Sequence, residues 1–142
     1  MELKLFVATK AFIERDGKVL LLRESAKYHD GTNIGKYAEV GGRITPGEHL
    51  EEALRREVKE EIGLDVEIGA PFFVNETLPR PTVRGEEWQV IKVFFACKSP
   101  AGEIKLSDDH DDYLWLDPAD YRDPKVIANL HPVFEAYLKA RH

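Results

Sequence analysis

Between Gly42 and Leu64 the chain carries a glycine, an arginine and four glutamates at spacings that suit the binding of a divalent metal beside a pyrophosphate. The pattern is Gly-x5-Glu-x7-Arg-Glu-Val-x-Glu-Glu-x-Gly-Leu. Carboxylate and carbonyl oxygens, waters and substrate phosphates are the ligands that Mg2+ and Mn2+ prefer. Such metals neutralise phosphate oxygens and activate a water molecule for attack. The residues therefore predict the metal-dependent cleavage of a phosphoanhydride.

A helix must hold these carboxylates in place. The turn residues Pro46 and Gly47 precede an apolar periodic run that starts near Glu48. Gly63 ends this run at a position where helices favour a left-handed residue. We therefore predict a helix over residues 48–62. Its apolar side chains fill one broad sector and are Leu50, Ala53, Leu54, Val58 and Ile62.

The three later carboxylates fall within this apolar sector or at its edge. At roughly 100° per residue, Glu57 and Glu61 lie close to Leu50, and Glu60 lies at the border. Like charges turned toward the protein are costly unless a cation compensates them. An alternative is an acidic helix that faces solvent and pairs with its own basic residues. The inward angle and the adjacent Gly41-Gly42 pair favour metal binding.

The segment from Gly42 to Leu64 resembles the signature box of the Nudix hydrolases, with every defining position matched. The resemblance implies an α/β fold, the Nudix-type α/β/α sandwich with a mixed β-sheet between helices. It also implies hydrolysis of a nucleoside diphosphate linked to another group. The metal ligands that it implies are Glu57, Glu60, Glu61 and the main-chain carbonyl of Gly41. The supporting residues that it implies are Gly42, Glu48, Arg56 and Gly63. Glu48 is expected to pair with Arg56 and so orient the helix.

Composition limits the class of protein. At 142 residues the chain is long enough for one domain, which we place at residues 1–142. The hydrophobic fraction is 43%, but no apolar stretch reaches the roughly 18 residues that would span a bilayer. We therefore expect no membrane partner. A net charge of -6 argues against a nucleic acid polymer as partner. The single Cys97 sits in an apolar run that suggests packing, and it favours a reducing, cytoplasmic compartment. Whether two chains associate as a homodimer stays open.

The remaining elements follow from periodicity and turn residues. Strands are expected at Leu3–Glu14, Val19–Leu22, Tyr37–Val40, from Leu64 onward, at Trp88–Lys98, near Ile104 and at Tyr113–Leu116. Loops are expected at Arg23–Gly35 and at Ser107–Asp112, and a loop or hairpin that could reach over the site is expected at Pro79–Gly85. Helices are expected to start at Pro118 and at Pro124, the second running to Lys139.

The water that attacks the phosphoanhydride needs a base. Our first choice is Glu60 and the second is Glu57, because close carboxylates share proton affinity. Asp109, in the acidic loop, is a further candidate for base or ligand, as in similar proteins of the family. The alternative for that loop is a solvated acidic turn. His110 as a ligand is the weaker reading, since loop histidines are usually solvated.

Substrate contacts can also be assigned to candidates. Arg23 and Lys36 could meet substrate phosphates, or each could be an exposed charge at the end of a strand. The side chains that could stack on a base are Tyr28, Phe73 and Trp88, although a structural role is the stronger reading for each.

The substrate class rests on the resemblance. A short chain of this kind resembles nucleotide-pool enzymes that use Mg2+, or Mn2+ as a substitute, to release pyrophosphate and a monophosphate from nucleoside triphosphates or modified nucleotides. One alternative is an ADP-ribose or other nucleoside diphosphate-sugar pyrophosphatase, for which Pro79 is weak support. A second is a non-catalytic Nudix-fold module that binds a nucleotide. A third is a helix whose carboxylates form structural salt bridges only.

Overall fold

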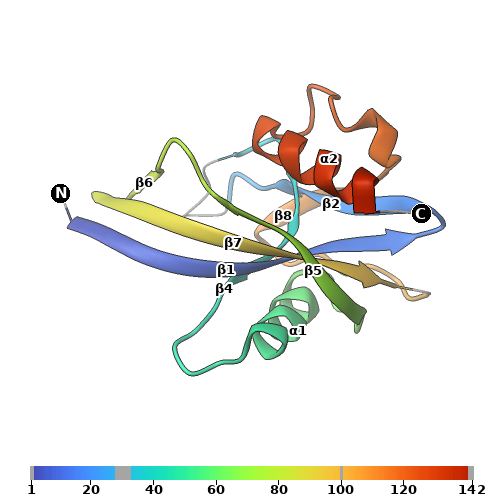
Figure 1. Cartoon of the computed structure of the whole chain (residues 1–142), viewed down its shortest axis with the longest axis horizontal. Helices are drawn as coiled ribbons and strands as arrows, with labels where there is room; N and C mark the ends of the chain where they lie inside the picture. Colours follow the sequence, from blue (N-terminus) through green and yellow to red (C-terminus); the bar gives the residue numbers. More distant parts are fainter. Residues whose placement is uncertain (1, 28–32, 100, 141–142) are drawn as a thin grey trace.

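In the computed structural model, which describes residues 2–27, 33–99 and 101–140, a mixed sheet of eight strands lies between two α-helices (Figure 1). The helix α1 covers one face and α2 covers the other, which confirms the expected α/β/α sandwich. The strands are β1 (Glu2–Arg15), β2 (Lys18–Glu24), β3 (Tyr37–Ala38), β4 (Val40–Arg43), β5 (Glu67–Glu76), β6 (Thr82–Val83), β7 (Glu86–Lys98) and β8 (His110–Leu116). The helices are α1 (Leu50–Ile62) and α2 (His131–Ala140), with short 3-10 turns at Pro118–Asp120 and Ala128–Leu130.

The long strand β1 organises the sheet. It runs parallel to β7 from the Glu2 and Glu86 pair to the Glu14 and Lys98 pair. On its other side it pairs antiparallel with β4 and then with β2. The main strand order is β3-β2-β1-β7-β5, and β8 extends from β2. The parallel pair among antiparallel neighbours makes the sheet mixed, as expected.

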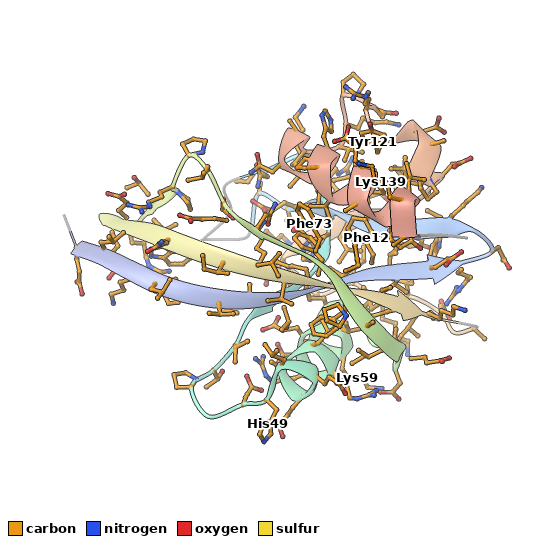
Figure 2. The ribbon with its side chains drawn as sticks, viewed as in Figure 1. Phe12, His49, Lys59, Phe73, Tyr121 and Lys139 are labelled. Atoms are coloured by element: carbon orange, nitrogen blue, oxygen red, sulfur yellow. The ribbon has the colours of Figure 1, made fainter. Side chains whose placement is uncertain are left out.

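Strand alternation divides the core into two layers. In β1, Phe12 packs on the α2 side, whereas Ala11 and Ile13 pack on the α1 side. The same alternation sends Phe94 and Phe95 to opposite faces of β7. Figure 2 shows Phe12 between the sheet and α2. Both faces of the sheet are therefore buried, and α1 is held firmly against it.

Three sequence-based expectations differ from the structure. The segment after Pro124 forms a turn and an isolated bridge to Tyr37 rather than a helix, because Tyr37 donates its N–H to the Lys125 carbonyl and its own carbonyl accepts from Ile127. Pairing with β3 therefore delays the helix to His131. Ile104 lies in no strand, and β8 begins at His110, inside the predicted acidic loop.

Within the described ranges, none of the helices is long and apolar enough to cross a membrane. Cys97 is buried, and burial raises the pKa of its thiol to about 12. A thiol that stays protonated behaves as a small apolar group, so its role is packing, as expected.

Candidate active site

Local sequence fixes both ends of α1, the helix that carries the box glutamates. At its start, the His49 N–H donates to the Glu52 side chain, one half of a capping box. At its end, Gly63 has a φ of 73° and donates its N–H to the Lys59 carbonyl. The helix therefore begins at Leu50, two residues after the predicted start, and ends where the glycine predicted. Figure 2 shows His49 and Lys59 on the outer side of α1, away from the sheet.

The Gly41-Gly42 pair lets β4 approach both its neighbouring strand and the helix. A Cβ on Gly41 would lie 2.2 Å from the Thr9 carbonyl oxygen, and Gly41 has a φ of 126°. A Cβ on Gly42 would lie 2.5 Å from a carboxylate oxygen of Glu57. The second glycine thus makes the space in which the Glu57 carboxylate lies.

Glu61 is buried beneath β4. Its Oε1 accepts a hydrogen bond of 2.7 Å from the Gly41 N–H, and its Oε2 lies 3.5 Å from His110 Nε2. Burial raises the pKa of this carboxyl to about 8, although the nearby Lys10 opposes the shift. The inward position that helix periodicity predicted for Glu61 is confirmed.

Glu57 and Glu60 are more open and share one partner. Glu57 is half-buried and accepts a bond of 2.9 Å from Arg56, and its pKa is raised chiefly by burial. The side chain of Glu60 is 58% exposed, at 3.3 Å from the same guanidinium. Glu57 turns inward as expected, whereas Glu60 lies at the solvent edge because its helical angle places it on the border of the apolar sector.

Arg56 joins the helix to the preceding loop. Its Nε and terminal nitrogen donate to both carboxylate oxygens of Glu48, each at 2.8 Å. These hydrogen bonds lower the pKa of Glu48 to about 2. The pairing that the family resemblance implied is present, and the same guanidinium orients Glu57 and Glu60.

The carboxylates face a cavity of about 1170 Å³. Its cations include Lys10 from β1, Arg43 from β4 and Lys92 from β7, and its acids include the buried Glu39. Arg43 lies over the Trp88 ring, with its guanidinium carbon 4.7 Å from the ring centroid. The three cations and Glu39 were not predicted. One feature of the sequence could have identified the two lysines: Lys10 and Lys92 each interrupt a strand that is otherwise largely apolar.

The other predicted site residues divide between the cavity and the outer surface. Asp109 and His110 line the cavity. Arg23 is outside the cavity lining and pairs with Asp111 at 2.7 Å. Lys36 is also outside it, and donates to the Pro124 carbonyl at 3.0 Å.

The predicted stacking residues are also placed differently. Trp88 lines the cavity, although it is buried against its strand neighbours. Phe73 packs against the core on the α2 side (Figure 2). Tyr28 falls outside the described residues. The segment Pro79–Gly85, which was expected to reach over the site, forms a hairpin with β7 and contributes Pro81 to the lining, and Thr77 just before it also lines the cavity.

The donor set fits a hard divalent cation. Glu57, Glu60, Glu61 and Gly41 all line the one cavity and offer only oxygen ligands. The buried Glu61 carboxyl, with its raised pKa, is a group whose charge a cation would stabilise. In the part of the chain that the structure describes, no three acidic, histidine or cysteine side chains already form a metal-binding group.

Comparisons with known proteins show the family of this chain. The family model described as the NUDIX domain matches residues 4–137. The chain belongs to the Nudix family. It is 37% identical to the nucleoside triphosphatase NudI of Escherichia coli O1:K1 over 114 residues, an alignment that covers 76% of this chain and 79% of that protein.

Solved Nudix structures share the fold. The MutT protein of Methanosarcina mazei Go1 superposes with a TM-score of 0.85 at 28% identity, covering 98% of this chain and 96% of that one. An ADP-ribose pyrophosphatase of Streptococcus suis superposes with a TM-score of 0.66 at 24% identity, covering 96% and 94%. The second likeness concerns the fold alone.

Membership makes this chain a Nudix hydrolase, an enzyme with pyrophosphohydrolase activity. Nudix hydrolases generally use divalent metals, which is consistent with the oxygen donors that line the cavity.

Proposed function

We propose that this Nudix hydrolase cleaves a phosphoanhydride in a nucleoside triphosphate or modified nucleotide with Mg2+, releasing pyrophosphate and a nucleoside monophosphate. The observation that carries the proposal is one cavity that holds both the box carboxylates and the cations Lys10, Arg43 and Lys92. Carboxylates suit the metal, and the Arg43 guanidinium suits the negative oxygens of a polyphosphate chain, whereas Lys10 and Lys92 lie against the Gly41 carbonyl and Glu39. The relative in E. coli is named a nucleoside triphosphatase, which supports this substrate class.

The proposed metal ligands are the carboxylates of Glu57, Glu60 and Glu61 and the carbonyl of Gly41. A bound Mg2+ would neutralise the phosphate oxygens and lower the pKa of the attacking water. The protein orients these groups through Arg56, which bonds to Glu57 and Glu60 from a position fixed by Glu48. Such preorganisation lowers the barrier because less rearrangement is needed during reaction.

The proton of the attacking water needs an acceptor. Glu60 stays our first candidate, because its carboxylate lies at the open edge of the cavity, where water has access. Glu57 is the second candidate and Asp109, also in the lining, is the third. Asp109 is not among the proposed ligands, so as the base its replacement by asparagine should lower kcat and leave metal affinity nearly unchanged. Glu60→Gln and Glu57→Gln should lower both kcat and metal affinity, because these residues are also proposed ligands.

The phosphate-binding roles of Arg23 and Lys36 stay predictions. Each is engaged by a neighbour, Asp111 or the Pro124 carbonyl, and each would have to leave that partner to reach the cavity. Single replacements by methionine test them: a role in substrate binding predicts a higher KM with unchanged metal affinity.

A product assay tests the proposed reaction. The purified protein is incubated with Mg2+ and nucleoside triphosphates, dinucleotides or nucleotide sugars, and the products are separated by chromatography. Pyrophosphate with a monophosphate is the expected result. AMP with a sugar phosphate would instead support the ADP-ribose class, and binding without turnover would support a non-catalytic module.

Matched variants of α1 tie the activity to the site. Glu57→Gln should reduce metal-dependent turnover by several orders of magnitude. Glu51→Gln is the control, because Glu51 is an exposed residue in the first turn of the same helix. Equal turnover in the two variants would reject the role of Glu57.

A further inference from the structure

Lys10 lies directly against the backbone carbonyl that we assign to the metal site. In the pairing of β1 with β4, Lys10 is the register partner of Gly41. Its ammonium donates to the Gly41 carbonyl oxygen at 3.2 Å, and its side chain is only 15% exposed. A lysine in this position already satisfies the carbonyl with a positive charge.

The charge of Lys10 also acts on the box carboxylates. Its proximity favours the charged forms of Glu61 and Glu57 and so opposes the effect of burial on both groups. Lys10 therefore interacts with three of the four groups assigned to the divalent ion. An ammonium and a dication cannot both use the same carbonyl without strong repulsion.

A second acceptor for Lys10 lies nearby. Glu39 has a side chain that is only 2% exposed, and its Oε2 is 4.0 Å from the Lys10 ammonium and 3.3 Å from that of Lys92. This buried carboxylate thus lies within reach of two ammonium groups from two different strands. A small movement of Lys10 would exchange the Gly41 carbonyl for a direct bond to Glu39.

We propose that Lys10 is a positioning residue that competes with the divalent ion for the Gly41 carbonyl and moves to Glu39 when the ion binds. The inference rests on the metal assignment of the proposed function. On this view the carboxylates of α1 raise the affinity for the metal, and the Lys10 ammonium of β1 lowers it. Glu39 then acts as the alternative site for the displaced ammonium.

Mn2+ titration of the intact protein, by calorimetry or by electron paramagnetic resonance, tests the competition without any substrate. Lys10→Met keeps the length of the side chain and removes its charge. It should bind Mn2+ on the order of tenfold more tightly than wild type, the size of one partly screened repulsion. Lys36→Met is the matched control, because Lys36 also donates to a backbone carbonyl but lies outside the cavity lining.

Glu39→Gln should have the opposite effect. It weakens the alternative acceptor, so Mn2+ should bind several-fold more weakly, and this loss should shrink when Lys10→Met is also present. Full additivity of the two changes would contradict the exchange. Should Glu39→Gln fail to fold, Lys10→Met still decides the matter, because Glu39 keeps its contact with Lys92 in that variant.

The outcomes separate this inference from the proposed function. Equal Mn2+ affinity in wild type and Lys10→Met would overturn the competition and leave the metal site intact. Weaker binding in Lys10→Met would also overturn it. Absence of Mn2+ binding in both proteins would overturn the metal assignment and this inference together.

Discussion

Gly41 and Gly42, the paired glycines of β4, offer a way to change turnover and stability separately. The alanine variant of Gly42 should lower turnover with little effect on the free energy of unfolding. In Gly42→Ala the new Cβ would lie 2.5 Å from Glu57 Oε2, whereas ordinary contact begins at 3.4 Å. The obstructing atoms are the flexible end of a side chain, so the carboxylate can move away by about 0.9 Å, the difference between these distances. A misplacement of about 1 Å at a catalytic group can cost about 100-fold in rate.

Folding should change little in the same variant. An off-rotamer side chain costs about 0.5–1.5 kcal/mol. The lower entropy of an unfolded chain with alanine in place of glycine returns about 0.4–1 kcal/mol. The free energy of unfolding of Gly42→Ala should therefore stay within about 1 kcal/mol of wild type, while metal-dependent turnover falls about 100-fold.

Gly41→Ala, in contrast, should lower the free energy of unfolding substantially. Its Cβ would meet the rigid Thr9 carbonyl at 2.2 Å, and its φ of 126° disfavours any side chain. Backbone strain of about 1–3 kcal/mol and overpacking of about 1–3 kcal/mol add to a loss of about 2–6 kcal/mol. Gly47→Ala is the control for strain alone, because its φ is 96° and no atom lies within 4 Å of the new Cβ.

Urea unfolding and steady-state kinetics on the same preparations give the two readouts. Two results would refute the reasoning about Gly42: turnover at the wild-type level, or a loss of unfolding free energy as large as that of Gly41→Ala. Gly47→Ala should lose stability and keep its turnover per folded molecule.

Three further predictions concern the buried Glu61 carboxyl, the Arg56 guanidinium and the core residue Phe134. The folded-state pKa of Glu61, about 8, exceeds its usual value of 4.5, so with EDTA present the unfolding free energy should fall as pH rises from about 4.5 to 8. Glu61→Gln should reduce this slope, leaving the part that Glu57 contributes, and gain up to about 5 kcal/mol at pH 8 in urea unfolding; an unchanged slope would contradict the assignment. Arg56→Lys keeps a positive charge but loses the two-point bond to Glu48. Turnover in steady-state kinetics should therefore fall by more than the fraction of protein that urea unfolding shows to be unfolded. Phe134→Ala empties a fully buried site between α2 and the sheet and should cost about 3–5 kcal/mol in urea unfolding, with metal affinity unchanged in calorimetry.

Local rules predicted the elements whose causes lie close together in the sequence. The Asp16-Gly17 turn has both residues at positive φ, as a tight hairpin requires, and it joins β1 to β2. Gly63 ends α1 through its own backbone conformation. The helix from Pro124 was predicted too early for the opposite reason, since its first residues pair with Tyr37, far away in the chain.

The sequence by itself determined which candidate oxygen ligands are present, their spacing along one helix and the two glycines beside them. Those features depend on helical periodicity and residue size, which act over a few positions. Only the tertiary structure decided that Lys10, Glu39 and Lys92 meet beside Gly41. Their meeting depends on strand register between distant segments, and register follows from the packing of the whole sheet.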